Sequence, residues 1–252
     1  MILLLDIGNT RIKWGTFSQG KLQPGRAMLR GGDAIATLLD KVEQRCGAPL
    51  RVMVSNVAGS DVIDPLNEQV AARWRSEVET VQTQSAAFGI TNGYDEPQRL
   101  GVDRWLALIA ARQMCDRALC VVDCGTALTV DLLDRQGGHL GGMIVPGVGL
   151  MQGALISNTD ALTLESDRQA GKYPLFAARN TADGITGGVQ YTLAALIDRV
   201  AVDAKVLIGE EAAVVLTGGD AAVLKPQLRC NPRFEPDLVL KGMVVVAEVD
   251  GR

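Results

Sequence analysis

The sequence has only one histidine, His139, in 252 residues, and this scarcity excludes most enzymes that depend on imidazole chemistry. A Ser-His-Asp triad needs a histidine as its general base, and histidine-rich metal sites need several of them. His139 lies between glycines in "GGHLGG". Such a setting is typical of loops and strand boundaries. We therefore expect His139 at a turn or at the end of a strand.

Paired cysteines are lacking as well. The chain has five cysteines, an odd number, and none of them form a Cys-x-x-Cys pair. Such a set is typical of reduced thiols in a cytoplasmic protein. We predict that most of them are buried. They are Cys46, Cys115, Cys120, Cys124 and Cys230.

Long apolar runs and basic runs are both missing. No segment reaches the ~18 uninterrupted apolar residues that a membrane span requires. The apolar start of the chain has no charged region before it and no cleavage site, and Asp6 ends it. The net charge is −4, and no run of five basic residues occurs. The sequence therefore predicts neither membrane insertion nor nucleic-acid binding.

The two commonest glycine-rich nucleotide motifs are absent. There is no GxxxxGK[ST], so the chain is not a P-loop enzyme. The segment "GVGLMQG" after Pro146 lacks the spacing GxGxxG, and we expect a Pro-Gly corner to separate it from the strand before it. Dinucleotide binding is therefore not expected.

Predicted strands and helices alternate through both halves of the chain, which indicates an α/β fold. The weakest point for a domain boundary is near residue 115, and we expect domains at 1–115 and 116–252. The stretch 238–249 is compatible with a buried helix or a strand. Strands are predicted at 1–5, 12–17, 51–57, two within 118–133, one after 138 and one at 212–217, and helices at 34–46, 62–74, 102–113, after Pro146 and at 185–200.

One short pattern occurs twice. "LLLDIGNT" (3–10) and "CVVDCGTALT" (120–129) both run from an apolar strand to aspartate, any residue, glycine and then threonine. The glycine lets the backbone bend and present N–H groups, and the threonine adds a hydroxyl. Such a turn can hold phosphate oxygens, while the aspartate holds a hydrated cation. A single copy would indicate an ordinary turn, but two copies, one in each half, favour phosphate binding. A third glycine turn, "LTGGDA" (216–221), suits the adenosine side of a nucleotide.

The segment "GYDEPQRLGVDRW" (93–105) is the other candidate for chemistry. Asp103 and Arg104 fall in the first turn of a predicted helix that follows Gly101. Taken alone, they suggest an aspartate favoured by the helix dipole and an arginine in a surface ion pair. Beside two phosphate-binding turns, an ionised Asp103 could instead orient an attacking hydroxyl and accept its proton, while Arg104 donates to the substrate.

Taken together and in order, these motifs resemble those of the type III pantothenate kinases, over residues 2 to about 247. Two small departures are Gly184, where the family usually has alanine, and Cys124, where it often has alanine or serine. Neither removes a polar group that the chemistry needs. The matching segments are "DIGNT", "GVDRW", "DCGTALT", "GGMIVPG", "NTADGITGG", "TGGDA" and "PDLVLKGM".

The resemblance implies two RNase-H-like (actin-like ATPase) domains that flank a nucleotide cleft. It implies ATP-dependent phosphorylation of pantothenate, the first step toward coenzyme A, by a cytoplasmic homodimer that needs Mg²⁺ and a monovalent cation, K⁺ or NH₄⁺.

The resemblance also implies roles for individual residues. Asp103 would be the proton acceptor, Asp123 a ligand of the monovalent cation, and Asp6 a ligand of Mg²⁺ through water. The substrate would contact Tyr94, Gly101, Val102, Asp103, Arg104 and Thr181. The ATP phosphates would contact Asp6, Ile7, Gly8, Asn9, Thr10, Arg11, Ile12, Lys13 and Thr126.

Simpler roles stay open for several of these residues. Asp6 and Asp123 could merely accept hydrogen bonds from turn N–H groups, and Tyr94 could be a packed loop aromatic. Thr181 could cap the long helix that follows it. Lys13 could reach a phosphate or only water. Trp105 lies on an apolar stripe and is expected in the core.

Two other functions compete with the kinase. A catalytically idle relative could act as a regulatory factor in gene expression, since a fold alone does not settle function. Such a protein would have no physical reason to keep this whole set of aspartates together. A sugar kinase is the other alternative, but 252 residues leave no room for the insertions that sugar kinases usually carry.

Overall fold

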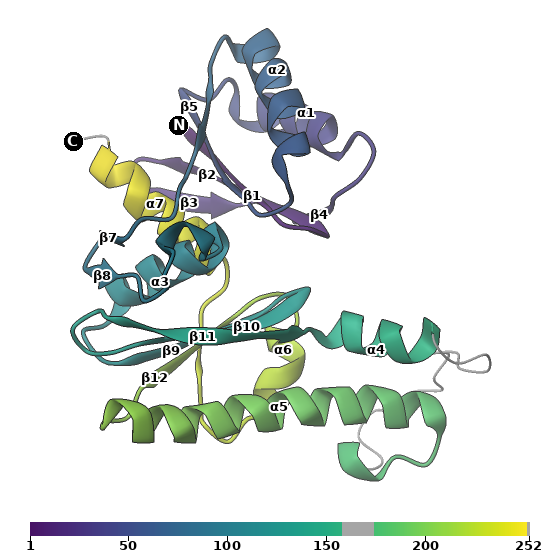
Figure 1. Ribbon diagram of the computed structural model, residues 1–252. Helices are drawn as coiled ribbons and strands as arrows, with labels where there is room; N and C mark the ends of the chain where they lie inside the picture. Colours follow the sequence, from purple (N-terminus) through teal and green to yellow (C-terminus); the bar gives the residue numbers. More distant parts are fainter. Residues whose placement is uncertain (158–173, 251–252) are drawn as a thin grey trace. The chain divides into compact units, whose positions relative to one another are not determined.

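The computed structural model describes residues 1–157 and 174–250, and its chain divides into two compact units (Figure 1). Unit 1 comprises Met1–Cys115 together with Asp237–Arg252, and unit 2 comprises Asp116–Pro236. The C-terminal segment is therefore part of unit 1, whereas the sequence placed it in the second domain. Among the described residues, no helix is both long enough and apolar enough to cross a membrane.

Unit 1 is built on a sheet with the strand order β3-β2-β1-β5-β6, and β4 also pairs with β2. Strands β1, β2 and β3 are antiparallel, and β5 and β6 continue parallel to β1. The strands are β1 (Ile2–Ile7), β2 (Arg11–Ser18), β3 (Lys21–Pro24), β4 (Met28–Leu29), β5 (Arg51–Asn56) and β6 (Val78–Thr80), with a separate hairpin of β7 (Ala86–Ala87) and β8 (Ile90–Thr91).

Helices cover both faces of this sheet, so its central strand β1 has consecutive apolar residues from Ile2 to Leu5. Leu3, Leu5 and Ile7 of β1 belong to the core cluster formed with α1 and α2. Leu4 lies between them and is also fully buried, because α7 contacts β1 from the other side. The helices of unit 1 are α1 (Ala34–Cys46), η1 (Ser60–Val62), α2 (Ile63–Trp74), η2 (Pro97–Arg99), α3 (Val102–Met114) and α7 (Leu238–Asp250).

The ambiguous C-terminal stretch is a helix, α7, and it packs on α3. Gly242 allows the close approach, because a Cβ at this position would lie 2.1 Å from the carbonyl oxygen of Leu106. Arg51 adds a bond from β5, with its Nη1 donating to the carbonyl of Ala247 at 3.3 Å. These long-range contacts explain why α7 belongs to unit 1.

Unit 2 repeats the arrangement of unit 1. Its strand order is β11-β10-β9-β12-β13, with β9, β10 and β11 antiparallel and β12 and β13 parallel to β9. Helix α5 covers one face of this sheet (Figure 1). The elements are β9 (Leu119–Cys124), β10 (Ala127–Leu133), β11 (His139–Pro146), α4 (Val148–Ser157), η3 (Leu175–Ala177), α5 (Thr181–Ile208), β12 (Ala213–Thr217), α6 (Ala221–Leu224), η4 (Lys225–Gln227) and β13 (Arg233–Phe234).

Several local predictions can be compared directly with the structure. His139 begins β11, as a strand-end residue should, and its Nε2 lies 2.9 Å from Oδ1 of the buried Asp131. Asp33 directly precedes α1, but its side chain makes no capping hydrogen bond. The prediction that most cysteines are buried is wrong, since all five are free thiols but only Cys120 and Cys124 are buried.

Candidate active site

The first aspartate–glycine turn connects β1 to β2 in unit 1. Asp6 is buried in β1, and its Oδ1 accepts a hydrogen bond from the hydroxyl of Ser55 at 3.1 Å. Ser55 is its neighbour on the parallel strand β5. The turn is closed by the Gly8 amide, which donates to the carbonyl of Arg11 at 3.0 Å. A buried carboxylate is costly without a polar partner, and Ser55 supplies one that the sequence did not indicate.

The residues of this turn divide into two groups. The side chains of Ile7 and Ile12 are fully buried in the core, so only their backbone groups could contact a nucleotide. Asn9, Thr10 and Arg11 are exposed, and Lys13 is half-buried on β2. The exposed tip therefore offers backbone amides, a hydroxyl and positive charge, which are the groups that bind phosphate oxygens.

Arg30 holds the same tip in place and was missed by sequence reasoning. Its backbone amide donates to the carbonyl of Thr10 at 2.8 Å, and its Nε donates to the carbonyl of Asn9 at 3.0 Å. Pairing of β4 with β2 brings it there, since Leu29 lies opposite Arg11. No local pattern in the sequence reveals a contact across twenty residues.

The second turn connects β9 to β10 in unit 2 and matches the first. Asp123 is the penultimate residue of β9, as Asp6 is of β1. The Gly125 amide donates to the carbonyl of Ala127 at 3.1 Å, and the carbonyl of Thr126 accepts from the Gly147 amide at 2.9 Å. The repeated sequence pattern thus marks equivalent turns in two sheets of the same topology.

The third glycine turn packs directly against the second. A Cβ on Gly218 would lie 2.4 Å from Oδ1 of Asp123 and 2.4 Å from the carbonyl oxygen of Cys124, and Gly218 has a φ of +96°. The amide of Asp220 donates to the carbonyl of Cys124 at 2.9 Å. Only glycine fits this position, because it has no side chain and tolerates positive φ. Carboxylate and carbonyl oxygens are therefore gathered around Asp123.

Cys124 lies within this second turn but is unsuited to act as a nucleophile. Burial raises the pKa of its thiol from 9.0 to about 12, and the charges of Asp123 and Asp220 add to this effect. A thiol with so high a pKa stays protonated at neutral pH, and the thiolate is the reactive form. Cys124 therefore packs as a small apolar residue of the core.

Asp103 and Arg104 begin α3 in unit 1. Asp103 lies in the first turn after Gly101, and its Oδ1 accepts from the amide of Arg104 at 2.8 Å. The Arg104 side chain is buried, with only 7% of the residue exposed, so the alternative of a surface ion pair is wrong. Val102 is buried as well, which leaves only its backbone for substrate contact.

Tyr94 holds the Arg104 guanidinium. The Nη1 of Arg104 donates to the Tyr94 hydroxyl at 2.7 Å, and the guanidinium carbon lies 5.6 Å from the centre of the tyrosine ring. A cation over an aromatic face is stabilised by the ring as well as by the hydrogen bond. Tyr94 is thus more than a packed loop aromatic, since it holds the buried guanidinium of Arg104 with its hydroxyl and its ring.

Thr181 is the first residue of α5 in unit 2, but it is not the cap of this helix. Asn180 occupies the cap, with its Oδ1 accepting from the amide of Asp183 at 2.8 Å. The capping alternative for Thr181 is therefore wrong. Its side chain is exposed, which leaves it able to contact a ligand.

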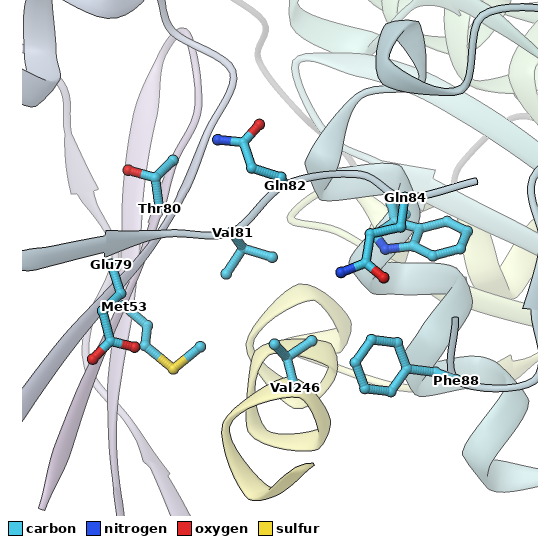
Figure 2. A pocket seen from close by; sticks show the side chains of 9 residues that line it. Met53, Glu79, Thr80, Val81, Gln82, Gln84, Phe88 and Val246 are labelled. Atoms are coloured by element: carbon cyan, nitrogen blue, oxygen red, sulfur yellow. The ribbon is translucent and has the colours of Figure 1, made fainter. Parts of the chain in front are cut away.

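Unit 1 also has a pocket of about 260 Å³ that contains none of the predicted site residues (Figure 2). Trp105 borders it and is otherwise buried, as predicted for a core residue. Glu79 at its edge is held by two bonds from Arg51, Nε to Oε1 at 2.9 Å and Nη2 to Oε2 at 2.6 Å. The lining residues are Met53, Glu79, Thr80, Val81, Gln82, Gln84, Phe88, Trp105 and Val246.

Comparison with known proteins decides the family. The model of the type III pantothenate kinases matches residues 2–203 of this chain. The chain belongs to the type III pantothenate kinase family. A type III pantothenate kinase of Nitrosococcus oceani is 40% identical over 253 residues, covering 98% of this chain and 94% of that protein. Another, from Aromatoleum aromaticum, is 40% identical over 257 residues and covers 99% of both.

Solved structures show the same fold in more distant proteins. A Campylobacter jejuni protein assigned to the Baf family of transcriptional activators has a TM-score of 0.61 at 20% identity, covering 99% of this chain and 98% of that one. An inorganic polyphosphate/ATP-glucomannokinase from Arthrobacter has a TM-score of 0.50 at 16% identity, covering 99% and 98%. These structures share the actin-like ATPase fold with this chain, which has one main sheet in each unit. At such identities the likeness speaks for the fold alone, and it does not favour the regulatory alternative.

Proposed function

We propose that this chain transfers the γ-phosphoryl group of ATP to the terminal hydroxyl of pantothenate, forming 4'-phosphopantothenate in the first step of coenzyme A biosynthesis. The chain belongs to this kinase family, and the proposal rests on the arrangement of side chains at the start of α3. There Asp103 stands beside a buried Arg104 that Tyr94 holds in place. A carboxylate next to a fixed cation is suited to orienting an alcohol in a substrate that also carries a negative charge.

Each residue has a defined part in this proposal. Asp103 orients the hydroxyl and accepts its proton, and Arg104 donates to the substrate. Gly101, Val102 and Thr181 complete the substrate contacts. The Asp6–Lys13 turn and Thr126 hold phosphate oxygens with their amides and hydroxyls. Phosphoryl transfer relies mainly on such positioning and charge stabilisation.

The two aspartates at the strand ends fit the cations that the family implies. Asp6 has one carboxylate oxygen on Ser55, an arrangement that suits contact with Mg²⁺ through water. Oδ1 of Asp123 and the carbonyl oxygen of Cys124 both lie against Gly218, and oxygen ligands of these kinds suit a monovalent cation, K⁺ or NH₄⁺. Among the residues that the structure describes, no group of three or more His, Cys, Asp or Glu could hold a metal ion, so neither site is a carboxylate cluster. Such cations would neutralise phosphate charge.

We also propose that the chain is a homodimer that joins through unit 2. Helix α4 extends beyond the sheet after β11 (Figure 1), and none of its ten residues is buried or charged. Ile144 on β11 and Phe176 in η3 are 61% and 73% exposed. Exposed apolar side chains such as these suit an interaction surface, and a second copy of the chain is the partner that the family implies.

The dimer is tested by light scattering coupled to gel filtration. Ile144→Glu should convert a dimer to a monomer, whereas Val206→Glu, on a still more exposed residue near the C-terminal end of α5, should leave it intact. A wild-type monomer at micromolar concentration would refute the proposal.

The free cysteines fit a reducing compartment, and we propose that the enzyme works in the cytoplasm.

The function itself is tested with purified protein, ATP, Mg²⁺ and pantothenate. Phosphopantothenate should form, and more slowly when Na⁺ replaces K⁺. A folded protein that forms no product under any of these conditions would instead support the non-catalytic alternative. Phosphorylation of sugars but not pantothenate would support a sugar kinase.

A further inference from the structure

The loop before α3 contains one buried polar side chain, Asn92, for which the reaction has no assigned use. Only 8% of the residue is exposed, and it follows directly after the β7–β8 hairpin. Buried amides are costly unless their donors and acceptors are satisfied, so the partners of Asn92 show what it does.

Asn92 joins three separate parts of this loop. Its Nδ2 donates to the carbonyls of Gln84, at 3.3 Å, and Pro97, at 3.0 Å. Its own amide donates to the carbonyl of Ser85 at 2.9 Å, which extends the hairpin by one pair. Both hydrogens of the side-chain amide are therefore used to hold the chain before the hairpin against the chain that enters η2.

The remaining side-chain oxygen acts on Tyr94. Oδ1 of Asn92 accepts from the Tyr94 amide at 3.0 Å, the two-residue spacing of an Asx turn. Tyr94 in turn accepts from Nη1 of Arg104, whose amide is bonded to Asp103. Asn92 is thus bonded to Tyr94, and Tyr94 to the guanidinium of Arg104, the residue that follows Asp103 in α3.

We propose that Asn92 is a positioning residue for the pantothenate site. It fixes the backbone of Tyr94 so that the phenol meets the buried guanidinium, and Tyr94 thereby orients the Arg104 side chain, the proposed donor to the substrate. The inference rests on the proposed function, because it assigns Asn92 to the binding of the same substrate.

The test compares Asn92→Ala, Asn92→Ser and Tyr94→Phe, each alone, with the double variant Asn92→Ala/Tyr94→Phe. Asn92→Ala should lower kcat/KM for pantothenate by about tenfold or more, because small displacements of positioning groups are costly. The KM for ATP should stay near its wild-type value. Asn92→Ser should recover part of the loss, since a serine hydroxyl can form the same turn with the Tyr94 amide.

The double variant distinguishes positioning from general stabilisation. If Asn92 acts through the Tyr94–Arg104 pair, the double variant should lose little more activity than the worse single variant. Asn67→Ala is the matched control, because Oδ1 of the half-buried Asn67 accepts from the Val78 amide at 3.3 Å elsewhere in unit 1. It should lower the melting temperature without changing kcat/KM.

The possible outcomes separate this inference from the proposed function. Losses that simply multiply in the double variant, or an Asn92→Ala enzyme that melts earlier but has normal kcat/KM, would overturn the positioning role while leaving the function standing. A wild-type protein that cannot phosphorylate pantothenate would overturn both. If Asn92→Ala does not fold, Asn92→Ser replaces it. The double variant Asn92→Ser/Tyr94→Phe is then compared with its two single variants by the same criterion.

Discussion

Asp103→Asn is the substitution that most directly tests the chemistry. Asparagine has the shape of aspartate and keeps an oxygen for the Arg104 amide, which now donates to Asp103 at 2.8 Å. The asparagine side chain cannot, however, accept the proton of the substrate hydroxyl as a carboxylate can. A positioned general base contributes about 10²–10⁴ in rate, so kcat should fall at least about 100-fold. The charge lost from the first turn of α3 should cost only about 0.3–1 kcal/mol of stability.

The chain contains a closely matched control for this change. Asp61 lies in the first turn of η1, two residues after Gly59, as Asp103 lies two residues after Gly101. A Cβ on Gly59 would come 2.7 Å from Oδ1 of Asp61, and one on Gly101 would come 2.6 Å from Oδ1 of Asp103. Asp61→Asn thus makes the same local change away from the proposed site.

Initial rates of phosphopantothenate formation and thermal unfolding should be measured for both variants. We expect similar small changes in melting temperature and a large loss of kcat for Asp103→Asn only. Turnover within a few-fold of wild type in a folded Asp103→Asn protein would refute the assignment of Asp103 as proton acceptor. Equal losses in both variants would point to helix stability as the cause.

Three further predictions concern the turns and the buried thiols. Asp123→Asn should abolish the difference in rate between K⁺ and Na⁺; a difference that persists would exclude Asp123 as the cation ligand. Gly8→Val should raise the KM for ATP while the protein stays folded. Gly218→Ala, at a φ of +96°, should instead lower the free energy of unfolding of unit 2 by about 1–3 kcal/mol in denaturant titrations. If Gly8→Val yields no soluble protein, the prediction for Gly8 is contradicted. Burial raises the pKa of both Cys120 and Cys124 from 9.0 to about 12. As the pH rises, the thiols therefore lose their protons in the unfolded chain before they do so in the folded one. Their contribution to the free energy of unfolding should be fully present below pH 9 and should be lost between pH 9 and 12. A Cys120→Ala/Cys124→Ala variant with an equally steep fall would contradict this reasoning.

The sequence predicted the features that depend on local patterns. The alternation of strands and helices, the two aspartate–glycine turns and the start of α3 at Val102 were all foreseen and are present. Each of them rests on residues within about ten positions of one another, where period and turn chemistry determine the backbone.

Features that depend on distant residues were not foreseen. Ser55 on Asp6, Arg30 on the first turn and Asn92 across its loop are all contacts that the fold creates between separated segments. Thr181 was a reasonable capping candidate, but Asn180 beside it has the extended backbone that a cap requires. The position of α7 was missed because its packing depends on the approach of Gly242 to α3.

The return of the C-terminus to unit 1 has a consequence for biosynthesis. The ribosome finishes residues 116–236 before it makes α7, so unit 2 emerges as a continuous stretch and can fold while translation continues. Unit 1 must wait, with the apolar surfaces of α3 and β1 uncovered, until the final helix leaves the exit tunnel. A chain that stops before α7 would therefore contain all of unit 2 but only part of unit 1.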